Sequence, residues 1–113
     1  LFGQGDGEFY RPTAYLTGSL PQSLAVADLN SDNYNDIVVA SSGTNHIIIL
    51  FGQAGGEFFF RRNYQTGSGP ISLAVADLNN DRYPDIVVAN TASNDVSVLL
   101  GFGNGTFLNQ IVY

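Results

Sequence analysis

An all-β fold is predicted by three observations on this chain of 113 residues. Almost every landmark recurs 49 residues later, each repeat holds four short runs rich in Val, Ile, Leu, Phe and Tyr, and Gly, Asn, Asp, Ser and Thr separate the runs. Such runs are typical of strands joined by turns. Four antiparallel strands repeated every 40 to 50 residues or so indicate the blades of a β-propeller. We therefore expect two full blades plus one extra strand.

The internal repeat covers almost the whole chain. Residues 1–49 and 50–98 are identical at 28 positions, and a partial third copy occupies residues 99–113. We accordingly divide the chain into an orphan outer strand of a partial repeat at 1–15, a first blade at 16–64 and a second blade at 65–113. Because the chain begins within a repeat, we expect it to be a processed product or part of something longer.

The expected strands follow this repeat in order. They are the orphan strand Glu8–Tyr15, then Ser23–Leu29, Asp36–Ala40, His46–Phe51 and Glu57–Tyr64 in the first blade, and Ser72–Leu78, Asp85–Ala89, Asp95–Leu100 and Thr106–Tyr113 in the second. Small Ala25 and Ala27 suit a first strand near the crowded propeller axis, which places the fourth strand at the rim. Residues 37–40 show no polar alternation, so we expect that strand to be covered on both faces.

Composition excludes several classes of function. The chain is 44% hydrophobic and 12% charged, which suits a folded domain, and it has no cysteine, so the redox compartment stays open. Its four basic residues form no run, so we expect no nucleic-acid binding. The longest apolar runs, such as Ile47–Phe51, are far shorter than the roughly 20 residues that a membrane-spanning helix needs. Six of the ten acidic residues lie in two loops, so the acidity is local.

Each loop joins the first two strands of a blade and is rich in side-chain oxygen. Loop positions one, three, five and nine are Asp28, Asn30, Asp32 and Asp36 in the first loop and Asp77, Asn79, Asp81 and Asp85 in the second. With the backbone carbonyl of Tyr34 or Tyr83 at position seven and both oxygens of the last aspartate, each loop offers about six oxygen ligands, which suits Ca²⁺. The absence of sulfur and imidazole argues against zinc. We predict two calcium sites.

An alternative interpretation is that these residues only close hairpins. Asp and Asn form turns through bonds from their side chains to the backbone. Three carboxylates within nine residues repel one another unless a positive charge lies between them, and the arrangement occurs twice. Both facts favour the metal.

The ADLNxDxxxDIVVA segments, with Phe2-Gly3 and Phe51-Gly52 at a fixed distance upstream, resemble FG-GAP and VCBS repeats, which occur in integrin α-subunit propellers and many secreted proteins. The resemblance implies an extracellular propeller whose calcium loops cluster on one face. The sixth loop position, usually Gly in that family, is Asn33 or Arg82 here. Because Arg adopts a left-handed backbone less readily than Asn, we expect the second site to bind more weakly.

These features together predict a calcium-stabilised extracellular scaffold for binding or adhesion, with protein or glycan as ligand. The alternative is a structural subunit that assembles head to tail into a filament or extracellular matrix. Its partners would be further copies of itself or the rest of a longer propeller chain, because two blades do not close a ring. No Ser-His-Asp or Cys-His set can be assembled around the single histidine, His46, so we do not expect an enzyme. Asn104-Gly105-Thr106 is a candidate N-glycosylation site.

Overall fold

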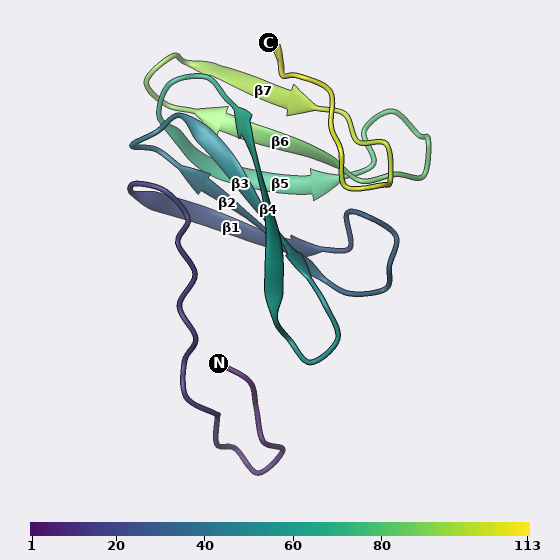
Figure 1. Ribbon diagram of the computed structural model, residues 1–113. Helices are drawn as coiled ribbons and strands as arrows, with labels where there is room; N and C mark the ends of the chain where they lie inside the picture. Colours follow the sequence, from purple (N-terminus) through teal and green to yellow (C-terminus); the bar gives the residue numbers. More distant parts are fainter.

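The computed structural model describes residues 1–113, apart from the side chains of Phe60 and Arg61. Its secondary structure consists of strands joined by turns and loops (Figure 1). The first sheet contains β1 (Pro21–Ala27), β2 (Asp36–Ser41), β3 (His46–Gly52) and β4 (Phe58–Gln65), and the second contains β5 (Pro70–Ala76), β6 (Asp85–Asn90), β7 (Asp95–Leu99) and β8 (Ile111–Val112). Both sheets are antiparallel with neighbours in chain order, so the predicted all-β fold of two four-stranded units is confirmed.

The two terminal segments contain less strand than expected. The orphan strand at residues 8–15 is reduced to one antiparallel bridge between Gly3 and Phe9, because only Leu1–Gly3 corresponds to the strand that would pair with it. The strand expected at residues 106–113 is divided into a bridge between Gly101 and Phe107 and the short strand β8. The bridges match the pairing of Gly52 with Phe58, so all three lie at the same place in the repeat.

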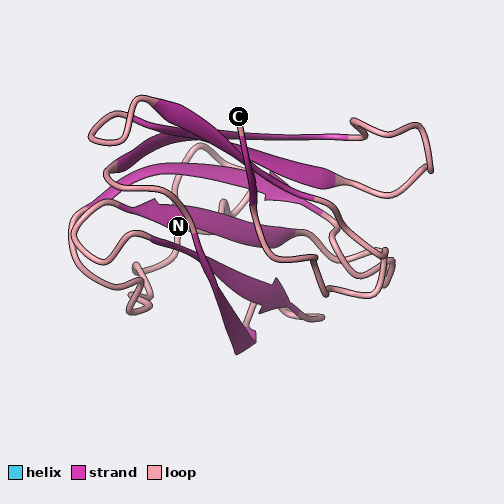
Figure 2. Cartoon of the chain, turned by 90° about the horizontal axis from the view of Figure 1, so that it is seen from above, coloured by secondary structure: helices cyan, strands magenta, loops and turns pink.

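The core lies between the two sheets, which stack face to face with β5 against β1 and β2 (Figures 1 and 2). Alternate residues of a strand point to opposite faces, so one face of each sheet enters this core. The buried cluster contains Val38, Ala40, Ile47 and Ile49 from the first sheet and Ile86, Val88 and Leu99 from the second. Burial of this apolar surface is the main force that holds the sheets together.

The opposite face of the first sheet is also covered. Val39, Ile48 and Leu50 are no more than 6% exposed, as predicted for a strand region covered on both sides. The N-terminal segment provides part of this cover, since the ring of Tyr15 packs edge-on against Phe58 with 5.4 Å between ring centroids. The first and the fourth strand of each sheet lie at its two edges.

Candidate metal centre

Asp36 anchors the first acidic loop. It is fully buried at the start of β2, where one carboxylate oxygen accepts a hydrogen bond from the Leu29 N–H (2.7 Å) and the other accepts one from the Gly52 N–H (2.9 Å). Leu29 follows β1 and Gly52 ends β3, so one carboxylate ties three strand ends together. The sequence predicted that this strand would end at Leu29, but β1 ends at Ala27. The hydrogen bond from Leu29 N–H to Asp36 explains the earlier end.

Asp28 organises the beginning of the same loop. Its carboxylate accepts hydrogen bonds from the N–H groups of Asn30 (3.3 Å), Asp32 (3.3 Å) and Asn33 (2.9 Å). Ser31 and Asn33 have left-handed backbones, with φ of 62° and 67°. Alternation of left-handed with ordinary residues lets successive N–H groups converge on one anion. The expected left-handed conformation at the sixth loop position is therefore confirmed.

The second loop repeats this geometry. Its hydrogen bonds run from Leu78 N–H to Asp85 (2.8 Å), from Gly101 N–H to Asp85 (2.8 Å), from Asp81 N–H to Asp77 (3.2 Å) and from Arg82 N–H to Asp77 (2.8 Å). Asn80 and Arg82 are left-handed, with φ of 64° and 70°. A side chain other than Gly or Asn in this region costs about 1 kcal/mol or more, so Arg82 carries strain that Asn33 largely avoids.

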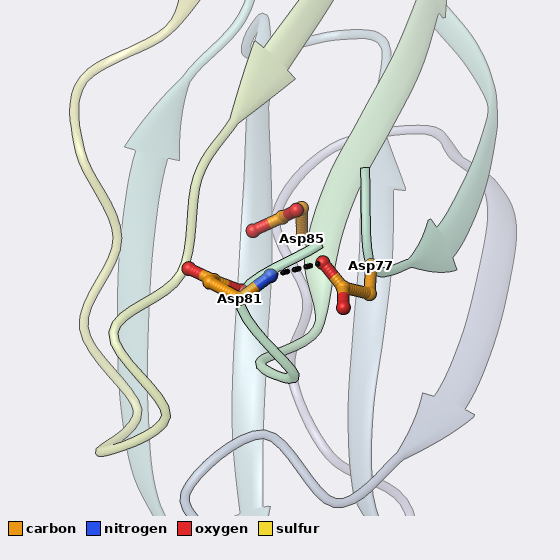
Figure 3. Close-up of side chains that lie close together, drawn as sticks. All are labelled: Asp77, Asp81 and Asp85. Carbon is orange, nitrogen blue, oxygen red and sulfur yellow. Dashed lines mark hydrogen bonds between the residues drawn. The ribbon is translucent and has the colours of Figure 1, made fainter. Parts of the chain in front are cut away.

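Three carboxylates converge in the second loop. Oxygen atoms of Asp77, Asp81 and Asp85 all lie within 4.8 Å of one another, and Figure 3 shows their side chains gathered around one space. The loop backbone contributes to this arrangement through the hydrogen bond from Asp81 N–H to Asp77, drawn as the dashed line in Figure 3. Three negative groups at this separation suit a divalent cation that takes oxygen ligands.

Asn30 provides an independent indication in the first loop. Its side-chain oxygen is buried and has no hydrogen-bond partner among the described residues. A buried acceptor without a partner costs about 1–3 kcal/mol, which a bound cation would offset. The second loop therefore fits calcium in its number, charge and type of donors. In the first loop the carboxylates of Asp28, Asp32 and Asp36 do not form such a cluster among the described residues, and the indication there is the Asn30 oxygen. Bound calcium would supply a positive charge that joins the ends of neighbouring strands.

Two aspartates of the loops have shifted acidities. Burial raises the pKa of the Asp36 carboxyl, the backbone N–H donors oppose this rise, and the nearby carboxylates of Asp32 and Asp28 add to it. Burial also tends to raise the pKa of the Asp77 carboxyl. The backbone N–H donors of residues 79–82 together outweigh this effect, so the pKa of Asp77 is lowered. A cation near Asp36 would favour its ionised form and so relieve the cost of its burial.

The glycine-rich hairpin at residues 101–107 covers the first loop, a contact that sequence reasoning did not anticipate. Gly105 N–H donates to the carbonyl of Leu29 (3.1 Å), and the hydroxyl of Ser31 donates to the carbonyl of Gly103 (2.8 Å). Leu29 is 1% exposed under this cover, whereas its equivalent in the second loop, Leu78, is 50% exposed. The following repeat therefore contacts the first loop on one side and buries Leu29, while residues 31–35 stay exposed.

The remaining predicted positions lie near the loops or at the surface. Tyr34 and Tyr83 are exposed, and each donates its N–H to the aspartate two residues earlier at 2.9 Å. Asn104 is exposed, and its side-chain oxygen accepts hydrogen bonds from the N–H (3.0 Å) and the hydroxyl (2.5 Å) of Thr106. His46 starts β3, where its Nδ1 lies 2.6 Å from the carbonyl oxygen of Thr44.

The turn-forming interpretation accounts for part of this geometry. The hydrogen bonds of Asp28 and Asp77 are those of residues that close a turn. They do not account for the convergence of three carboxylates in the second loop or for the unpartnered Asn30 oxygen in the first. The cation interpretation explains both.

Comparison with known proteins identifies one family. A family model described as FG-GAP-like repeat matches residues 28–88, which include both acidic loops and more than half of the chain. No curated protein and no solved structure matches the chain. Among the described residues, no helix has the length and apolar character needed to cross a membrane.

Proposed function

The chain belongs to the FG-GAP-like repeat family, and on that premise we propose that it is a calcium-stabilised, extracellular β-propeller module that acts as a scaffold for binding or adhesion, with a protein or glycan as ligand. The observation that carries this proposal is the convergence of Asp77, Asp81 and Asp85 within 4.8 Å. The same hydrogen-bonded frame in the first loop supports a second site. In this function the protein binds a partner and does not transform it.

Calcium has a structural role in this proposal. Each loop spans the ends of two neighbouring strands, and a cation between its carboxylates would hold those ends together while removing their mutual repulsion. At 100 times its dissociation constant, calcium would stabilise the fold by about 2.7 kcal/mol per site. The extracellular location is supported by the family, whose members are typical of extracellular proteins.

Calorimetric titration with calcium, with magnesium as the comparison ion, tests the metal function. We expect two calcium sites, with the second weaker because of the strain at Arg82, and a melting temperature that falls when a chelator is added. A melting curve that does not respond to calcium or chelator, together with no heat of binding, would remove calcium from the function.

The second candidate function, head-to-tail assembly into a filament or matrix, is favoured by the outer face of the second sheet. Val87 and Ala89 of β6 and Val96 and Val98 of β7 are equivalent to the four first-sheet residues in the core, yet Ala89 is exposed and the others are only half-buried. A further repeat, from another copy or from a longer chain, fits that face as the second sheet fits the first. Such a contact closes a ring or extends a filament, depending on its rotation.

Sedimentation velocity and electron microscopy in calcium and in chelator separate the two candidates. Discrete particles support the scaffold, and long polymers support the filament.

A further inference from the structure

A cleft of about 340 Å³ lies between the outer strand of the first sheet and the last segment of the second. Asn63, Tyr64 and Gln65 of β4 line one side, and Asn109 and Gln110, just before β8, line the other. The acidic loops contribute no residue to this lining, so the cleft is separate from the candidate metal centre. Four of the five lining residues carry amide side chains, and none of the five is charged.

We propose that this cleft binds a neutral saccharide. The inference names the ligand class of the binding scaffold proposed above and rests on that function. Each amide side chain has both a donor group and an acceptor oxygen, which matches sugar hydroxyls that donate and accept at once. A charged ligand would find no opposite charge among the lining residues, and an apolar ligand would leave the amides without partners.

Tyr64 gives the cleft a rigid wall. Its hydroxyl oxygen accepts a hydrogen bond from the Phe107 N–H (3.1 Å), and its ring packs edge-on against the Phe107 ring, with centroids 5.7 Å apart. The ring is therefore fixed from both ends before a ligand arrives. A rigid aromatic side chain provides contact area at little cost in conformational entropy.

Gln110 is oriented by a buried polar network. The hydroxyl of Ser97 donates to the side-chain oxygen of Gln110, which leaves the NH₂ group of that amide for a ligand. Ser97 is fully buried, and its oxygen accepts hydrogen bonds from Gly67 N–H (3.1 Å) and Asn90 Nδ2 (2.8 Å). Residues that hold a binding group in one orientation reduce the entropy lost on binding.

This network breaks the internal repeat. Ser97 stands where the first repeat has the buried Ile48, and Asn90 stands where it has Ser41. Asn90 is 2% exposed, and its side-chain oxygen has no hydrogen-bond partner in the described part of the chain. Polar residues that replace apolar core residues weaken packing, and such departures from the local pattern are typical of functional sites. The buried network beside the cleft is thus a specific feature of the second repeat.

NMR titration in calcium-containing buffer tests the proposal, with methyl glycosides of glucose, galactose, mannose and N-acetylglucosamine as probes. At least one glycoside should give saturable shifts of the side-chain NH₂ signal of Gln110 and of the backbone N–H signals of the other lining residues. Gln110→Ala should weaken its binding about tenfold, the loss expected from one hydrogen bond and its supporting geometry. Gln53→Ala is the matched control, since Gln53 is an exposed glutamine outside the cleft, and it should leave binding unchanged.

Three results would overturn the proposal: no glycoside binds in the millimolar range, Gln110→Ala binds as tightly as the unmodified chain, or glucuronic acid binds in preference to the neutral sugars. Ser97→Ala should also weaken binding while β7 stays folded, and Gln110→Ala remains informative if that buried change unfolds the protein. The melting response to calcium is measured on the same samples. Saccharide binding without a calcium response would refute the metal function and leave the cleft intact, and the reverse result would refute the cleft alone.

Discussion

Replacing Asp81 with asparagine should weaken calcium binding while preserving the loop, because it keeps an oxygen donor but removes a negative charge. Asp81 is exposed, and its Oδ1 accepts a hydrogen bond from the Tyr83 N–H at 2.9 Å. An asparagine oxygen can accept the same bond. The substitution therefore removes one of three charges that lie within 4.8 Å and leaves the turn closed. Asp32→Asn is the equivalent change in the first loop, where Asp32 accepts from the Tyr34 N–H at 2.9 Å.

The magnitude follows from linkage between binding and folding. Calcium at 100 times its dissociation constant contributes about 2.7 kcal/mol per site. With an unfolding entropy of about 2.1 cal/mol/K per residue, this corresponds to about 11 °C in melting temperature for a chain of this length. Asp81→Asn should lower the contribution of the second site in calcium, so the melting temperature should fall by up to this amount. In chelator it should leave the melting temperature unchanged or raise it slightly, because a repulsive charge has left the cluster.

Asp6→Asn is the matched control. Asp6 is also exposed and also accepts an N–H bond from two residues later, that of Glu8 at 3.0 Å, but it lies outside both loops. Thermal unfolding followed by circular dichroism should show no change in its calcium response. If Asp81→Asn lowers the melting temperature equally in calcium and in chelator, the aspartates only close turns, and the metal interpretation is wrong.

Three further outcomes are expected. Leu20→Gly should stabilise the protein by up to about 1 kcal/mol in chemical denaturation, because Leu20 has φ of 54° and glycine adopts that conformation without strain; a loss of stability would contradict this. Gly105→Ala should destabilise the protein more than Gly5→Ala does. The two glycines have nearly equal φ values, 87° and 88°. A Cβ on Gly105 would lie 2.9 Å from the Phe51 ring, whereas a Cβ on Gly5 would meet nothing within 4 Å. In chelator, the Asp36 carboxyl should titrate by NMR above the ordinary carboxyl pKa, because burial raises it. The contribution of Asp36 to the free energy of unfolding is then largest in acid, and it is lost as the pH rises through the raised pKa of the folded state. A titration midpoint for Asp36 below the ordinary carboxyl range would refute the shift.

The strands could be predicted from the sequence because the signal is local and occurs twice. Residues 36–41 and 85–90 form equivalent strands with equivalent pairing partners, so one repeat confirmed the other. The segment at residues 8–15 is equivalent to the β4 region in the repeat, yet it forms only a bridge. A strand needs a partner as well as a suitable composition, and the repeat pattern describes composition alone.

The ligand positions of the loops could be predicted for the same reason, since their spacing is local. The buried network of Ser97 and Gln110 could not, because neither residue is unusual for a β-sheet protein. Only the placement of Ser97 inside the core distinguishes it, and that burial depends on the packing of two sheets. A comparison of the repeats at the position of Ile48 provides the one sequence signal, an isoleucine replaced by serine.

The cover over the first loop implies that its calcium affinity depends on the neighbouring repeat. Ser31 donates to Gly103, which lies 72 residues away, whereas no such bond is found for its equivalent Asn80 in the described residues. A loop already held by its neighbour loses less entropy when it binds a cation. Ser31→Ala should therefore weaken the first site by about tenfold, the effect of one hydrogen bond, and leave the second unchanged. Calorimetry on Asp81→Asn, in which the second site is weakened and the first is unchanged, isolates this effect. Equal affinity with and without Ser31 would show that the two repeats bind calcium independently.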